Sequence, residues 1–440
     1  MPPLSAEAPD LYARLDRLFA AEPEIRTLEN GLKLVFQRDP THPLLSCQVW
    51  IRTGSIHEEE HLGRGLSHFL EHMVFKGTER RGPGRIPEEV QSFGGHLNAY
   101  TSFDRTVYHI DGPAEKLAAS LDLLADLALH PVFPEEELRR EKEVVLREID
   151  MTVDDPDRTL ARTLFRTAFR EHPVRFPVIG LRPLFEEVDR GMVAAYHRRR
   201  YLPGNVVLVI CGDADREAVV AEAEATFGKV PLRAAHPVVI PPEPRQLAMR
   251  KELRYGDYQL CRGMMAWKIP SLRGEGACGL DILAAIIGAG QSGRLRQRLR
   301  DELGLVYNIT AGAWNPRDPG LFLVSYQCDP GKAGEVEERI RETCEGYAKE
   351  AFSEKEVEKA RRFAFVSEIQ ARQTVSGRAS RLGLLSAIVR DENYPRRYFE
   401  TLKDLTGERL RVLAGETFRT EKLNQVRLQP ESSRAKGPSP

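Results

Sequence analysis

Hydrophobic positions along this chain follow two periods, one typical of strands and one typical of helices. Between residues 26 and 54, short apolar runs around an Asn30-Gly31 turn predict strands. Residues 114–130 carry apolar side chains at helical spacing, and residues 134–150 are predicted to form a long charged helix that starts at Pro134. Residues 205–210, apolar from Val206 onward, are typical of a buried strand. The first half of the chain is therefore predicted to combine a sheet with covering helices.

The same order of elements returns in the second half. Strands are expected near residues 261–267, 306–314 and 320–327, and helices at 280–287 and 332–348. The stretch that begins at Phe133 aligns with the one that begins at Phe352, at an offset of 219 residues. We therefore expect an α+β fold of two structurally similar domains, each a mixed or antiparallel sheet covered by helices.

Proline residues mark the boundary between the two halves. Five prolines between residues 229 and 250 predict a stiff, extended linker. The chain is expected to begin with an N-terminal extension, residues 1–24, which contains a short helix at residues 9–20. A first domain (25–228), the linker (229–250), a second domain (251–428) and a disordered tail (429–440) are expected to follow.

Composition and charge narrow the class of protein. Lys and Arg total 64 against 65 acidic residues, so no nucleic-acid partner is expected. No run of about 18 apolar residues occurs, so no membrane span is expected. The six cysteines are widely spaced and none forms a Cys-x-x-Cys pair, which favours reduced core thiols over a disulfide framework. The N-terminal residues lack a signal-peptide pattern, so a cytoplasmic location is expected.

Residues that can carry chemistry concentrate in a predicted buried helix, Leu66–Phe75. His68 and His72 are four residues apart, so their imidazoles lie on one helix face at a separation suited to a shared zinc ion. Glu71 lies beside that face. Buried ionisable groups are costly unless they are paired or bind a metal. The pentapeptide alone is also compatible with surface His and Glu on a polar stripe.

A third ligand can come from the helix at 134–150. Glu141 and Glu148 are seven residues apart and share one helix face. They are also compatible with ordinary acids on a solvated helix. All eleven histidines lie at or before His236, and the offset of 219 places Ala360 and Ser367 where the first half has these two acids. A metal site is therefore expected in the first half.

The motif His68–His72, followed by Glu148 after 76 residues, resembles the pitrilysin/insulinase family of inverted-motif zinc peptidases. The resemblance covers roughly residues 25–425 and is closest to two-domain, processing-peptidase-like members. Further stretches that resemble the family are Phe75–Thr78, Gly95–Thr101, His172–Gly180, Tyr201–Asn205 and Gly293–Tyr307.

The resemblance implies a role for each residue of the metal motif. His68, His72 and Glu148 would bind one Zn²⁺ per chain. Glu71 would act as the general base, and Glu141 would hold a ligand histidine.

The resemblance also implies how substrate is held. Asn98 and Ala99 would lie on an edge strand that pairs with an extended peptide, although ordinary sheet interior would also fit. Arg300 and Tyr307 would anchor substrate, and Tyr307 would also act in catalysis by donating to the substrate carbonyl. A helix-end Arg and a core Tyr remain the alternative for this pair.

The function implied is that of a zinc-dependent endopeptidase that hydrolyses peptides or unfolded polypeptide segments inside a closed chamber. One two-domain chain supplies half of the chamber of four-domain relatives, so a homodimer, or a heterodimer with a related chain, is expected. The alternative is a non-catalytic scaffold or partner subunit of a peptidase-like heterodimer.

Overall fold

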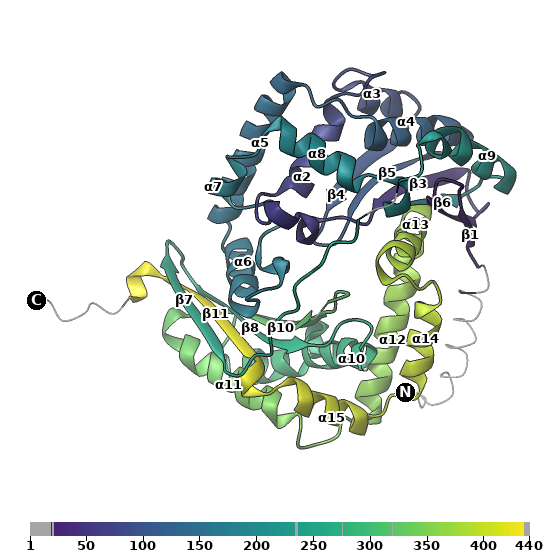
Figure 1. The fold of residues 1–440 in the computed structure, drawn as a ribbon. Helices are drawn as coiled ribbons and strands as arrows, with labels where there is room; N and C mark the ends of the chain where they lie inside the picture. Colours follow the sequence, from purple (N-terminus) through teal and green to yellow (C-terminus); the bar gives the residue numbers. More distant parts are fainter. Residues whose placement is uncertain (1–18, 20–21, 234–235, 275, 319, 435–440) are drawn as a thin grey trace, which may run out of the picture. The chain divides into compact units, whose positions relative to one another are not determined.

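The computed structural model describes residues 19, 22–233, 236–274, 276–318 and 320–434 (Figure 1). The helix predicted over residues 9–20 therefore lies outside the described residues, apart from Phe19. Contacts divide the chain into two compact units. The first comprises residues up to Leu146, Val178–Val239 and Ser367–Arg396, and the second comprises Arg147–Pro177, Ile240–Val366 and the chain from Arg397.

The first unit is built on a six-stranded sheet in the order β1-β2-β6-β3-β5-β4. β2 and β6 are parallel and all other neighbours are antiparallel. Every residue of β6 is buried, because this strand lies inside the sheet, whereas β4 is an edge strand with alternating exposure. The strands are β1 Glu24–Thr27, β2 Lys33–Arg38, β3 Leu44–Ile51, β4 His96–Thr101, β5 Thr106–Pro113 and β6 Val206–Gly212.

The second unit repeats this topology in a five-stranded sheet of order β7-β11-β8-β10-β9. A parallel pair, β7 and β11, is again followed by three antiparallel neighbours. The predicted α+β fold of two structurally similar domains is therefore confirmed. The strands are β7 Arg250–Gly256, β8 Cys261–Ile269, β9 Asn308–Trp314, β10 Gly320–Cys328 and β11 Leu423–Pro430.

Helices cover both sheets. α4 packs against β3 and β5 through a run of buried leucines and alanines. Asp155, which follows the last residue of α5, caps α6, because its side chain accepts hydrogen bonds from the amides of Asp157 and Arg158. Helices of the first half are α2 Leu66–Met73, α3 Arg85–Ser92, α4 Leu117–Leu129, α5 Glu135–Asp154, α6 Pro156–Ala168, α7 Arg182–Phe185, α8 Arg190–Arg200 and α9 Arg216–Thr226. Those of the second half are α10 Ala277–Gly288, α11 Ala333–Gly346, α12 Glu354–Ala371, α13 Val375–Gly383, α14 Tyr394–Lys403 and α15 Gly407–Thr417.

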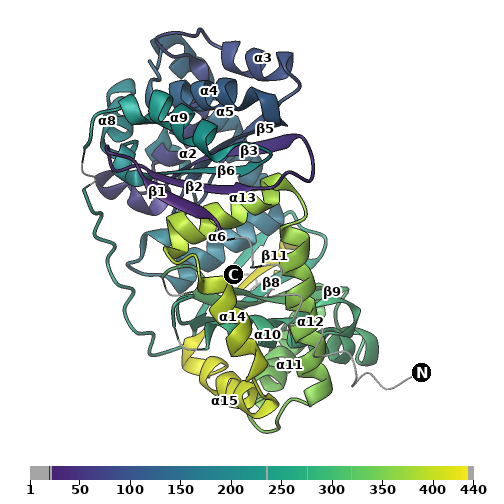
Figure 2. The same cartoon turned by 90° about the vertical axis from the view of Figure 1, so that its right-hand side faces the viewer.

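Two helices at equivalent positions pack on the sheet of the other half of the chain. α6 contacts β8 and β11 in the second unit, and α13, 219 residues later, contacts β3 and β6 in the first unit (Figure 2). On α13, Gly383 lies so close to Trp50 that an added Cβ would be 2.1 Å from its indole ring. On α6, Phe165 meets Trp314 edge-on with ring centroids 5.0 Å apart.

Because α6 and α13 each pack on the sheet of the other half, the two compact units differ from the consecutive domains expected at residues 25–228 and 251–428. The division falls inside α5 and inside α12, so each unit contains a segment from the other half of the sequence. The consecutive boundaries remain a prediction about the organisation of the chain.

The structure also bears on four smaller expectations. Residues 236–249 of the expected linker contain no helix or strand. The disordered tail expected from residue 429 is wrong for residues 429–434, because β11 runs to Pro430 and a short 3₁₀ helix follows at Glu431–Ser433. All six cysteines are free and five are buried, which confirms the predicted core thiols. Within the described part of the chain, no helix has the length and apolar character needed to span a bilayer.

Candidate metal centre

The predicted motif lies on the helix α2, which is held in place by a strongly apolar face. Leu66, Phe69, Leu70 and Met73 are fully buried, and α2 packs against α8 and β4. The helix is therefore held by its apolar face. Its His and Glu side chains are left at intermediate exposure on another side of the helix.

The beginning of α2 is fixed by a buried carboxylate that sequence reasoning missed. Glu58 accepts hydrogen bonds from the amides of Gly65 at 3.1 Å and Ser67 at 2.9 Å, so it satisfies amides at the helix N-terminus. Burial raises the pKa of Glu58 to about 8, although these hydrogen bonds act in the opposite direction. Gly65 adopts φ 70°, and a Cβ there would be 2.2 Å from the carbonyl oxygen of Ile179. Glu58 stands in an acidic run, so nothing in the sequence distinguishes it.

Three predicted metal ligands converge in the structure. One ligand atom from each of His68, His72 and Glu148 lies within 4.8 Å of the others. The two imidazole rings have centroids 4.6 Å apart. Two imidazoles and one carboxylate are a donor set that catalytic zinc uses in proteins, with the fourth position left for water or substrate. The residues present therefore fit a zinc ion in type, number and proximity.

The electrostatic state of His68 suits a metal ligand. Burial, assisted by the nearby His72, lowers the pKa of His68 to about 3. The imidazole is therefore neutral near pH 7, and metal coordination requires a neutral imidazole.

Glu141, on α5, contacts one of these ligands. Its Oε1 lies 2.9 Å from Nδ1 of His72, and its Oε2 lies 2.5 Å from Nζ of Lys76. Burial raises the pKa of Glu141, but the hydrogen bonds from His72 and Lys76 outweigh this effect and hold the pKa below its ordinary value. An ionised Glu141 accepts the Nδ1 proton of His72, which leaves Nε2 as the donor atom for a metal.

Glu71 follows His68 by three residues, next to two buried tyrosines. The hydroxyls of Tyr108 and Tyr201 are 2.8 Å apart. Burial raises the pKa of both phenols, and the charge of Glu71 adds a smaller contribution in the same direction. Both tyrosines are therefore neutral near pH 7.

The predicted substrate strand is β4, at the edge of the first sheet. Among the strands that the structure describes, β4 pairs only with β5. Asn98 is exposed, and its Oδ1 accepts a hydrogen bond from the amide of Ala99 at 2.9 Å. An unpaired strand edge that contacts the motif helix can accept an extended peptide by strand addition.

Arg300 and Tyr307 belong to the second unit. Arg300 lies on a π-helical segment, Arg296–Glu302. Tyr307 is 53% exposed, and its hydroxyl donates to Oδ1 of Asp329 at 2.7 Å. The phenol is therefore accessible and already oriented by a carboxylate. The roles predicted for this pair stay predictions.

Comparison with known proteins agrees with this arrangement. The family model described as Insulinase (Peptidase family M16) matches residues 33–181, which include His68, Glu71, His72, Glu141 and Glu148. The model described as Peptidase M16 inactive domain matches residues 187–363. A protein of Mycobacterium bovis called an uncharacterized zinc protease is 30% identical over 374 residues, covering 84% of each chain. The uncharacterized zinc protease YmxG of Bacillus subtilis is 28% identical over 394 residues, covering 89% of this chain and 95% of its own.

The fold and the cluster of donors are those of a two-domain metallopeptidase, and this chain belongs to the insulinase family, peptidase family M16. Among solved structures, a protease from Helicobacter pylori superimposes with a TM-score of 0.87 at 26% identity, covering 93% of this chain and 100% of that one. The periplasmic protease PqqL from Escherichia coli shares the fold with a TM-score of 0.78 at 20% identity, and this chain covers 49% of its length. The resemblance inferred from the sequence motifs is confirmed.

Proposed function

We propose that this protein is a zinc-dependent endopeptidase that hydrolyses peptides or unfolded polypeptide segments. It binds one Zn²⁺ per chain through His68, His72 and Glu148. The observation that carries the proposal is the convergence of these three donors within 4.8 Å in a chain whose relatives are called zinc proteases.

The residues divide the chemistry among them. Zinc, when bound, makes a water molecule acidic and polarises the carbonyl of the scissile bond. Glu71 takes the proton from the attacking water and delivers it to the leaving amine. Glu141 keeps His72 in the tautomer that coordinates through Nε2. Each residue therefore has one task, and these tasks are separable by mutation.

Substrate would be held as an added strand. The main chain beside Asn98 and Ala99, on the edge strand β4, pairs with the peptide, so recognition depends mainly on backbone groups rather than on side-chain identity. Arg300 and Tyr307 anchor the substrate from the second domain. The hydroxyl of Tyr307 donates to the carbonyl oxygen as negative charge develops on it.

The active unit would be a dimer that encloses a chamber. This chain covers about half of the periplasmic protease PqqL, so a pair of such chains equals one longer chain in length. In a two-fold pair, Arg300 and Tyr307 of one chain serve the zinc site of its partner. The free state of all six cysteines supports a reducing compartment such as the cytoplasm.

The alternative is a non-catalytic partner subunit. The description of the second family model as an inactive domain is the observation that favours it. That model covers residues 187–363, whereas all three metal donors fall in the other model at 33–181. The label therefore concerns a part of the chain that contains none of the three metal donors.

Two measurements on the purified protein distinguish these functions. Elemental analysis should find about one zinc per chain, and a quenched peptide library should be cleaved, with both signals lost in His68→Ala. A folded wild-type protein that holds no zinc, or holds zinc without cleaving any peptide alone or with a related chain, would support the scaffold instead.

A further inference from the structure

Glu141 has two carboxylate oxygens and a different partner on each. Oε1 lies 2.9 Å from Nδ1 of His72, while Oε2 pairs with Nζ of Lys76 at 2.5 Å. The side chain of Glu141 is 10% exposed and that of Lys76 is 27% exposed. A carboxylate in such a setting is costly unless its charge is paired, and a second partner also fixes its orientation.

We propose that Lys76 is a positioning residue of the zinc site, which acts through Glu141 on His72. Lys76 holds Oε2 of Glu141 and thereby aims Oε1 at Nδ1 of His72, so that Nε2 is presented to the metal. This inference rests on the proposed function, and it adds a residue that touches neither metal nor substrate. Groups that orient metal-ligating histidines typically change metal affinity by about 10- to 100-fold when removed.

Other cations close to Glu141 in sequence have other partners. Lys142 donates to the carbonyl oxygens of Glu186 at 2.6 Å and Val188 at 2.8 Å. Arg140 pairs with Glu136 and Glu137, one turn earlier on α5. Lys76 is therefore the cation that pairs with Glu141 in the structure, and Lys142 offers a matched control.

The backbone that carries Lys76 is fixed on its C-terminal side. Lys76 ends a 3₁₀ turn, Val74–Lys76, and Gly77 then adopts φ 121°. The carbonyl oxygen of Gly77 accepts from the amide of Val132 at 3.1 Å, and Thr78 forms a β-bridge with Pro131. A side chain that begins on a fixed backbone can place its ammonium group reproducibly.

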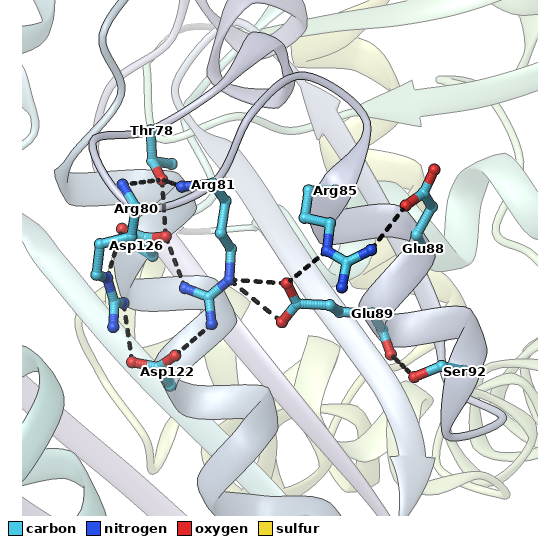
Figure 3. A network of polar contacts seen from close by, with 9 residues as sticks. All are labelled: Thr78, Arg80, Arg81, Arg85, Glu88, Glu89, Ser92, Asp122 and Asp126. Carbon is cyan, nitrogen blue, oxygen red and sulfur yellow. Dashed lines mark hydrogen bonds and ion pairs between the residues drawn. The ribbon is translucent and has the colours of Figure 1, made fainter.

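A charged network holds the loop that follows (Figure 3). Asp126 on α4 is fully buried and accepts from the hydroxyl of Thr78 at 2.8 Å, from Nε of Arg80 at 3.2 Å and from Nη1 of Arg81 at 2.7 Å. Asp122, one turn earlier, accepts from the same two arginines. The ion pairs of Arg80 and Arg81 with the two aspartates hold this loop against α4. The backbone that leads from Lys76 into the loop is therefore held as well.

The test is a double-mutant cycle read out as zinc affinity, measured by competition with a chelator of known affinity. Lys76→Met should weaken zinc binding by about tenfold, and Lys76→Arg should restore it to within about threefold of wild type. Lys142→Met, which removes the same charge nearby, should leave affinity within about twofold. In a Glu141→Gln background, Lys76→Met should cause no further loss, because the path to His72 is already broken.

Several results would overturn the inference. One is unchanged affinity in Lys76→Met, and another is an equal loss in the Glu141→Gln background. A third is a loss in Lys142→Met as large as that in Lys76→Met. If Lys76→Met does not fold, as judged by circular dichroism, Lys76→Gln supplies the same comparison. If wild-type protein binds no zinc, the proposed function itself fails, whereas tight zinc binding that ignores Lys76 removes only this inference.

Discussion

Nδ1 of His72 lies 2.9 Å from Oε1 of Glu141. Glu141 lies on the same face of α5 as Glu148, two turns earlier. The helix α5 thus brings two carboxylates to the motif helix in different capacities. Glu141 contacts Nδ1 of His72, whereas Glu148 belongs to the cluster of possible metal donors. We therefore expect the two acids, seven residues apart, to act as a supporting group and a ligand.

This separation predicts unequal effects of two similar mutations. Glu141→Gln should weaken zinc affinity by about 10- to 100-fold, because a neutral amide orients His72 less strongly. Glu148→Gln should weaken it further, since a metal donor is lost. Chelator competition on both variants measures the difference. Equal and complete loss from both would show that the ligand has been misassigned.

The cap of α2 predicts a pH-dependent effect on stability. Glu58 has a folded pKa of about 8, above the value of about 4.3 expected in the unfolded chain, so folded protein binds more protons between these values. The stability contribution of this group is therefore present below about pH 4 and is lost as pH rises toward 8.

Glu58→Gln should isolate that contribution. At pH 5 the variant should be less stable by about 1–2 kcal/mol, because its amide NH₂ cannot accept from the α2 amides. The deficit should shrink as pH rises from 5 to 8, where the wild-type carboxylate becomes a buried charge. Denaturant unfolding of metal-free protein at several pH values measures this, and a deficit that grows over the range would contradict the assignment.

Packing of α13 against the first sheet predicts a steric effect. Gly383→Ala places a Cβ 2.1 Å from the Trp50 indole, so it should cost about 1–3 kcal/mol by overpacking. Gly334→Ala on α11 is the control, because a Cβ there meets nothing within 4 Å, and it should be neutral or stabilising by up to about 1 kcal/mol. Thermal unfolding compares the two. Equal stability of both variants would mean that α13 does not pack on Trp50 in solution.

The metal motif could be predicted because its geometry is local. His68, Glu71 and His72 lie within eight helical residues, and a helix fixes their relative directions whatever surrounds it. Glu148 needed both the family resemblance and the helical period. The hairpins were predictable for the same reason, since the Asn30-Gly31 turn and apolar alternation are short-range signals.

The rest could not be predicted because it depends on contacts distant in sequence. Amphipathic patterns show that α6 and α13 bury a face, but not which sheet receives it. β11 was missed because polar residues such as Asn424 and Gln425 are buried in it, against the usual pattern. Glu58 belongs to an acidic stretch and Lys76 stands between Phe75 and Gly77, and the partner of neither can be identified without coordinates.

The proposed dimer predicts complementation between inactive chains. Glu71→Gln lacks the base and Tyr307→Phe lacks the substrate donor, so co-expression should form mixed dimers with one intact site and one doubly damaged site. Random pairing gives about half mixed dimers and therefore about a quarter of wild-type activity. Differently tagged chains, purified as verified mixed dimers, make the measurement, and these dimers should show about half of the wild-type activity, since one of their two sites is intact. No recovery in such dimers would show that Tyr307 acts within its own chain or has no role in catalysis.

The most direct test of the account is to measure zinc content and peptide hydrolysis together in Glu71→Gln. Glu71 is assigned as the base and not as a ligand, so the variant should retain about one zinc per chain while hydrolysis falls by at least about 10²- to 10⁴-fold. His72→Ala, as the control, should lose both. Near-wild-type turnover in Glu71→Gln, or loss of its zinc, would contradict the assignment of base and ligands on which the account depends.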